Sequence, residues 1–307
     1  MLPHAGTDGE QWRELVELGR VVRALAPVRG STVTADVALL WDWESFWAQD
    51  LEWHPSVDLD HRERVVAFYT RLWRDKITVD FAHPTADLSS YRMVVIPQLY
   101  LLDERAAANL HGYVSGGGQL LVSYFSGVVD SHDAVHPQGL CGPLGEVLGI
   151  SVQEFAPLAK GQRVTVDLMG RNASADVWTD RLAVTDPSAE VLGRFVDGPA
   201  AGRPAVTRRT LGNGSAWYLA TRFDVETLAL LMDPLYAAAD LTPRSDLPAD
   251  LEVVSRHSPD STYQFLINHT DREVDVDVSG TDLVTGIDHS DGVSVPASQV
   301  RIIRRPH

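Results

Sequence analysis

The residue types best suited to chemistry lie close together in one segment, Asp36 to Leu59, D-V-A-L-L-W-D-W-E-S-F-W-A-Q-D-L-E-W-H-P-S-V-D-L. Pairs of carboxylates carry out glycoside hydrolysis, and aromatic rings offer flat faces to sugars. The simpler interpretation, which we favour, is that the acids keep an aromatic segment soluble. Because each tryptophan buries about 150–250 Å² when covered, we expect the rest of the chain or another chain to cover this segment. The tryptophans and the acids considered for catalysis are Trp41, Trp43, Trp47 and Trp53, and Asp42, Glu44, Asp50 and Glu52.

A second group of polar side chains occupies residues 130–136, D-S-H-D-A-V-H. Its two histidines and two aspartates are side chains that bind divalent metal ions. The spacing fits no defined metal-binding motif, so we favour a solvated polar loop.

Ser126 is the remaining candidate nucleophile. Several α/β hydrolases place a nucleophile on a sharp turn after a strand. The turn here, S-Y-F-S-G over residues 123–127, lacks the G-x-S-x-G pattern, and the single cysteine, Cys141, lies beyond it. We therefore predict no catalytic residue, and we predict neither a metal nor a cofactor.

The elements that would position these residues alternate between short apolar strands and helices. We expect strands at 37–41, 78–82, 93–96 and 119–124, with helices at about 58–75 and 103–115. Apolar runs such as V-A-L-L and M-V-V-I indicate strands that are buried on both faces. Their alternation with helices predicts a parallel, doubly wound α/β sheet. The carboxyl ends of its strands should bring together three aromatic loops: the loop from Trp41 to Trp53, residues 97–100, and residues 124–127 with Tyr124 and Phe125.

Both ends of the chain differ from this pattern. Residues 8–26 predict an amphipathic helix with Asp8 as its N-cap, whose apolar face needs a partner, either the following domain or an upstream one. Residues 161–223 turn to strands, and Gly212-Asn213-Gly214 predicts a hairpin turn. Residues 251–305 predict a small antiparallel β domain.

The charge and composition of the chain limit its possible partners and location. The 307 residues carry a net charge of −16, which would repel a phosphate backbone, so we expect no nucleic-acid partner. The acidic, polar N-terminus lacks a signal-peptide pattern, and no apolar run is long enough for a membrane span. One cysteine is consistent with a reducing compartment, so we expect a cytoplasmic location and no membrane partner.

Several segments resemble the C-terminal half of the β-galactosidases of glycoside hydrolase family 42, from Met1 to about Arg305. The segments are M-L-P-H-A-G, V-A-L-L-W-D-W-E-S-F-W-A-Q, H-P-S-V-D-L, V-V-I-P-Q-L-Y-L-L, G-G-G-Q-L-L-V-S-Y-F-S-G-V-V-D and F-L-I-N-H-T. The family has a catalytic barrel, then a flavodoxin-like domain that forms trimers, then a small β domain.

The resemblance implies a flavodoxin-like (class I amidotransferase-like) doubly wound domain at 30–242 and a C-terminal β domain at 243–307. Residues 1–29 would be the last helix of the barrel and a linker. The family's catalytic glutamates lie upstream of the position matching Met1, so none is carried over and we expect no activity from this chain alone. The parent enzyme would hydrolyse terminal β-D-galactosides with retention.

The expected partner is therefore the chain itself, as a homotrimer, or a catalytic barrel, with galactosides bound only through the parent enzyme. The alternative is a free-standing sugar-binding module or weak hydrolase that uses the Trp41–Trp53 segment. We expect the following residues to form an interface or the wall of a pocket: Trp41, Trp43, Trp47, Trp53, His54, Tyr124 and Phe125.

Overall fold

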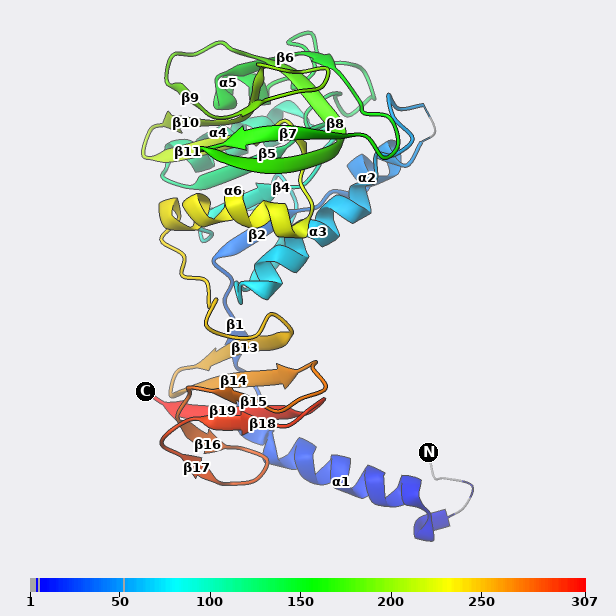
Figure 1. Ribbon diagram of the computed structural model, residues 1–307. Coiled ribbons are helices and arrows are strands. Elements are labelled where there is room, and N and C mark those ends of the chain that lie inside the picture. The colour runs from blue at the N-terminus through cyan, green and yellow to red at the C-terminus, as the bar shows by residue number, and fades with distance from the viewer. Residues whose placement is uncertain (1–3, 5, 52) are drawn as a thin grey trace. The chain divides into compact units, whose positions relative to one another are not determined.

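The computed structural model describes residue 4, residues 6–51 and residues 53–307 (Figure 1). The chain divides into two compact units. The larger comprises residues 35–73 and 77–243, and the smaller comprises the described part of residues 1–34 with residues 74–76 and 244–307. No helix of the described residues is long and apolar enough to cross a membrane.

Five parallel strands form one half of the large sheet. In sheet order they are β3 (Val79–Ala82), β2 (Val37–Leu40), β4 (Met93–Ile96), β5 (Gln119–Ser123) and β11 (Gly214–Leu219). Every residue of β2, β4 and β5 is buried, as their continuous apolar sequences predict.

The other half of this sheet is antiparallel. Strand β10 (Pro204–Leu211) pairs antiparallel with β11 and with β9 (Ala189–Phe195), and β7 (Arg163–Leu168) and β8 (Arg171–Val184) continue the sheet. Strands β6 (Ile150–Phe155) and β12 (Thr221–Arg222) pair with β8.

The prediction of a flavodoxin-like, doubly wound α/β fold is therefore wrong. The large sheet is mixed, because the tight turn at Gly212 folds β10 back along β11. A hairpin turn gives antiparallel neighbours, whereas a doubly wound sheet needs a helical crossover at each step. The strands of residues 161–223 therefore join the same sheet as the parallel strands and form its antiparallel half. The prediction of a C-terminal antiparallel β domain is correct.

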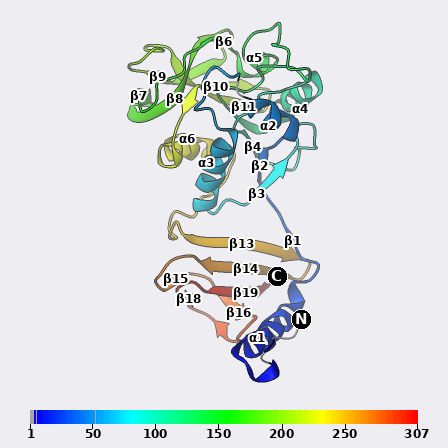
Figure 2. The same ribbon diagram turned by 90° about the vertical axis from the view of Figure 1, so that its right-hand side faces the viewer.

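Four helices of the larger unit are α3 (His61–Arg74), α4 (Glu104–Ser115), α5 (Leu144–Leu148) and α6 (Val225–Ala238). Helix α4 contacts β5 and β11, α5 contacts β6, β10 and β11, and α6 contacts β8. Asp103 caps α4 as predicted, since its side chain accepts a hydrogen bond from the Ala106 amide at 2.7 Å. Figures 1 and 2 both place α3 and α6 side by side.

The tryptophan segment is not the loop that its sequence suggested. Residues Trp43–Gln49 form helix α2, capped by Asp42, whose carboxylate accepts hydrogen bonds from the amides of Glu44 and Ser45. The helix was missed because its apolar residues do not form the inward stripe by which helices are recognised.

The smaller unit is a β domain with the N-terminal segment added. Strands β13 (Leu251–Ser258), β14 (Ser261–Asn268), β19 (Val300–Pro306), β16 (Gly280–Asp282) and β17 (Asp288–His289) pair in that order, with β1 (Thr32–Val33) at the edge beside β13. Strands β15 (Val274–Val276) and β18 (Val293–Val295) form a separate pair.

Helix α1 (Glu10–Ala24) belongs to the same unit. It has no buried residue, and Arg20 donates a hydrogen bond to the Val284 carbonyl at 3.1 Å. The predicted cap Asp8 is wrong by one residue, since Gly9 occupies the N-cap position. Residues 1–3 and 5 of the N-terminal motif lie outside the described residues.

Candidate functional site

Helix α2 turns its polar side inward and its aromatic side outward. Ser45 and Gln49 are both buried. The Ser45 hydroxyl accepts a hydrogen bond from the Leu101 amide at 3.1 Å, and the Gln49 amide donates to the Gln98 side chain at 3.0 Å. Trp43 and Trp47, one turn apart on the helix, are 57% and 62% exposed. This arrangement reverses that of an ordinary surface helix.

The exposed apolar surface continues beyond the helix. Leu51 is exposed, Trp53 is 93% exposed and Val57 is 94% exposed. We name these residues, with Trp43 and Trp47, the tryptophan patch. Single exposed apolar residues are common, but five within fifteen residues make this segment the candidate interaction surface. Glu52 lies outside the described residues.

A layer of rings supports the patch from below. Trp41 lies 5.1 Å from Trp43 and 5.0 Å from the ring of His61, and Phe46 lies 5.6 Å from His61. Within the described part of the chain, Nε1 of Trp41 and both ring nitrogens of His61 are buried without a hydrogen-bond partner. Burial lowers the pKa of His61 to about 4, although Asp60 and Asp42 favour its charged form.

A second group of rings lies inside the domain. Phe125 stacks on Tyr100 at 5.1 Å and meets Trp178 edge-on at 5.3 Å, and Tyr124 stacks on Trp178 at 5.8 Å. Tyr124 and Phe125 are fully buried. His54 joins this group, since its ring lies 5.5 Å from that of Phe125. The sequence predicted that these three aromatic segments are neighbours, and the ring distances confirm it.

A buried carboxylate anchors this interior group. Asp180 accepts hydrogen bonds from Nε1 of Trp178 and from the hydroxyl of Tyr218, each at 2.7 Å. Asp180 is fully buried, and burial raises the pKa of its carboxyl to about 7, although both hydrogen bonds oppose the rise. Its polar atoms therefore have partners, unlike those of His61.

The candidate nucleophile Ser126 and two of the side chains considered as metal ligands, Asp130 and His136, have structural roles. The Ser126 hydroxyl is buried, donates to the Ser123 carbonyl at 2.8 Å and accepts from the Leu99 amide at 3.1 Å. Asp130 accepts hydrogen bonds from the amides of His132 and Ala134 and so closes a turn. His136 is buried, with Nε2 2.9 Å from the Leu102 carbonyl.

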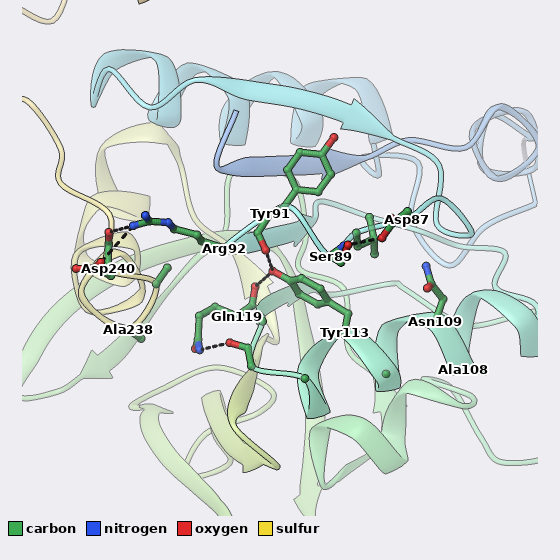
Figure 3. Close-up of a pocket in the computed structure, with 16 residues that line it drawn as sticks. Asp87, Ser89, Tyr91, Arg92, Ala108, Asn109, Tyr113, Gln119, Ala238 and Asp240 are labelled. Atoms are coloured by element: carbon green, nitrogen blue, oxygen red, sulfur yellow. Dashed lines mark hydrogen bonds and ion pairs between the residues drawn. The ribbon is translucent and has the colours of Figure 1, made fainter. Parts of the chain in front are cut away.

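A hollow of about 690 Å³ lies where β4 and β5 begin (Figure 3). Its polar groups contact the protein itself: the Tyr113 hydroxyl donates to the Tyr91 carbonyl at 3.2 Å, and Arg92 pairs with Asp240 at 3.2 Å. Gly118 lies against the Tyr113 ring, where a Cβ would come within 2.2 Å of it. The glycine run therefore serves packing, and we assign no ligand to this hollow.

Sequence reasoning missed the inverted helix, His61 and Asp180. The sequence W-E-S-F-W-A-Q does hold a signal, because Ser45 and Gln49 share one helical face and Trp43 and Trp47 share another. Asp180 had no such signal, since one of its two partners, Tyr218, is distant in sequence and no local pattern shows that the carboxylate is buried.

Comparison with known families identifies both units. Residues 35–242 match the model of the β-galactosidase trimerisation domain of glycoside hydrolase family 42, and residues 250–305 match that of its β-galactosidase C-terminal domain. A β-galactosidase from Arthrobacter sp. is 37% identical over 93% of the chain, and one from Heyndrickxia coagulans is 34% identical over 99%.

Solved structures agree. The crystal structure of β-galactosidase from Bacillus circulans sp. alkalophilus matches 99% of the chain with a TM-score of 0.92 at 30% identity. The chain spans less than half of each of these proteins, between 41% and 46% of their lengths. It therefore belongs to the glycoside hydrolase family 42 β-galactosidases, of which it comprises the trimerisation domain and the C-terminal domain.

Proposed function

We propose that this chain assembles a β-galactosidase into a homotrimer and that the tryptophan patch forms part of the interface between copies. The observation that carries the proposal is the inversion of α2, which presents Trp43 and Trp47 to the outside while burying Ser45 and Gln49. A helix with this pattern gains free energy when another surface covers it.

The family description supports a second copy as the covering surface, since residues 35–242 match a trimerisation domain. Trp41 would hold the patch from beneath, whereas His54 and the buried Tyr124 and Phe125 would shape the domain behind it. The relatives are named β-galactosidases, so hydrolysis of β-galactosides is the activity that we propose for the assembled enzyme. The single buried, unpaired cysteine supports our proposal of a cytoplasmic location.

Sedimentation velocity tests the assembly. The wild-type chain is expected to sediment at three times the 33.7 kDa of one copy at micromolar concentrations. A wild-type chain that remains monomeric would overturn the proposed function.

A paired variant tests the surface. Trp43→Ser with Trp47→Ser should shift the chain toward monomer, because it removes the largest exposed rings of α2. Ile287→Ser changes an exposed apolar residue of the smaller unit and is the matched control. If the double variant assembles as well as the control, the tryptophan patch is not the interface.

A further inference from the structure

A trimer requires more than the tryptophan patch. A surface that pairs with itself across a two-fold axis joins two copies, whereas each contact in a ring of three joins two different surfaces. The segment that carries the patch, residues 42–60, holds six acidic side chains and no lysine or arginine, so two patches that face each other would also repel. The domain that we propose to form the trimer should therefore present a second surface to the patch of the next copy.

A second exposed apolar surface lies on helix α3 and strand β3. Val66 and Tyr69 of α3 are 52% and 41% exposed, and Phe81 of β3 is 54% exposed. The rings of Tyr69 and Phe81 stack on each other, with their centroids 6.2 Å apart and their planes 20° apart. Val66 lies three residues before Tyr69 and is therefore its neighbour on the helix surface. We name Val66, Tyr69 and Phe81 the edge face.

The edge face is more apolar than folding of the single chain requires. The inner side of α3 already buries Val65, Phe68 and Leu72. Val66 and Tyr69 therefore give this helix a second apolar side, which the single chain leaves half exposed. Strand β3 is the last strand of the large sheet and pairs only with β2 among the described strands. Natural proteins usually cover or blunt such an edge, so the edge face has the features of a surface that a partner covers.

The edge face and the tryptophan patch adjoin each other but belong to different elements. His61, the first residue of α3, contacts Trp41 and Phe46 beneath the patch. Tyr69 lies eight residues further along this helix, or about 12 Å at helical spacing. The two contact surfaces of each copy in a closed ring of three approach each other near the central axis. Two surfaces that adjoin in this way therefore suit a small closed ring.

We propose that the tryptophan patch of one copy packs on the edge face of the next copy. The inference rests on the proposed trimer and names the two surfaces that meet in it. Trp43 and Trp47 are exposed rings that lie 6.1 Å apart, and they would cover the exposed pair of Tyr69 and Phe81. Contacts between aromatic rings stabilise an interface beyond the area that they bury.

Removal of the two rings of the edge face tests the docking by sedimentation velocity. Tyr69→Ser with Phe81→Ser should raise the concentration at which half of the chains are assembled by about tenfold or more, because a few aromatic contacts dominate most interfaces. Val135→Ser with Val196→Ser is the matched control, since it changes two apolar residues of the larger unit that are 60% and 56% exposed. Thermal unfolding shows whether both variants fold.

Opposite charges at Val66 test which surface covers the edge face. Glutamate and lysine both favour a helix, so Val66→Glu and Val66→Lys should fold alike. In the assembled ring either side chain would face the acidic segment of the next copy. The glutamate variant should therefore need about tenfold more protein for half-assembly than the lysine variant, and high salt should reduce this difference. If the two variants assemble alike, the edge face does not meet the acidic segment and the inference fails.

A mixture of two defective chains tests the pairing itself. Trp43→Ser with Trp47→Ser leaves the edge face intact, whereas Tyr69→Ser with Phe81→Ser leaves the patch intact. An equimolar mixture should form a dimer of one chain of each kind, because only one intact patch can meet one intact edge face. A mixture that contains no more dimer than either chain alone overturns the docking.

The outcomes separate this inference from the proposed function. If the wild-type chain is a trimer and Tyr69→Ser with Phe81→Ser folds and assembles as well as the control, the edge face is not part of the interface while the trimer stands. If that variant does not fold, the comparison of Val66→Glu with Val66→Lys decides. A wild-type monomer overturns both proposals.

Discussion

Two groups of aromatic rings in the same domain differ in whether their buried polar atoms have hydrogen-bond partners. The interior group around Trp178 is closed, with Nε1 of Trp178 and the Tyr218 hydroxyl both bound to Asp180. The outer group around Trp41 is open, with its outer rings exposed and the nitrogens of Trp41 and His61 unpaired within the described structure. Similar ring contacts therefore occur in a buried core whose polar atoms are hydrogen-bonded and at a surface whose outer rings are exposed.

We interpret the difference as that between a folded core and the interface that we propose between copies. A core gains its stability by burying rings and pairing every polar atom that goes in with them. The aromatic rings of an interface are exposed to water until the partner chain covers them. The two groups should therefore respond differently to substitution and to pH.

The largest difference should appear when a ring is removed from each group. Trp178→Ala should lower the free energy of unfolding by about 3–5 kcal/mol, because it leaves a cavity beside Phe125 and Tyr124. Trp47→Ala should change it by about 0.5 kcal/mol or less in the monomer, because that ring is largely in water. Urea unfolding at concentrations too low for assembly measures both. Equal losses would abolish the distinction between the two groups.

Three strands of the parallel half were predictable because they are short, mainly apolar runs. V-A-L-L, M-V-V-I and Q-L-L-V-S became β2, β4 and β5 with every residue buried. What the sequence did not reveal was how the later strands join them. A turn at Gly212 predicts that β10 and β11 pair, but not that β11 then pairs parallel with β5.

The candidate site was only half predictable. Four tryptophans in one segment are visible in the sequence, and so is the need to cover them. The sequence did not show which face of α2 is buried. Ser45 and Gln49 are buried through contacts with Leu101 and Gln98, which lie about fifty residues away. Local patterns report local periodicity, whereas the choice of the buried face depends on distant partners.

The next largest effect should come from the interior carboxylate. Asp180 has a pKa of about 7 in the folded chain against an ordinary value of 3.8, so the folded state binds the proton more tightly. The stability from this group is present below pH 4 and is lost as the pH rises toward 7. Asp180→Asn should remove that loss, on the order of a few kcal/mol. The measurement is urea unfolding at pH 5 and pH 8 for both chains, compared as a difference. If the free energy of unfolding differs between pH 5 and pH 8 by the same amount in Asp180→Asn and in wild type, ionisation of Asp180 does not destabilise the fold.

The contribution of the outer group to stability should depend on pH in the opposite direction and by a smaller amount. His61 has a pKa of about 4 in the folded chain against 6.5 ordinarily, so the unfolded chain takes up the proton first as the pH falls. Stability from this group is present above pH 6.5 and is lost between there and pH 4. His61→Leu should remove that loss and should stabilise the chain at pH 5 by about 1–3 kcal/mol, since the ring nitrogens have no partner to lose. His54→Leu is the control, because His54 contacts the Ala48 carbonyl at 3.0 Å and lies beside the interior rings. A His61→Leu chain that is less stable than wild type at pH 5 would mean that His61 is satisfied in solution, and the contrast between the open and the closed group would then rest on exposure alone.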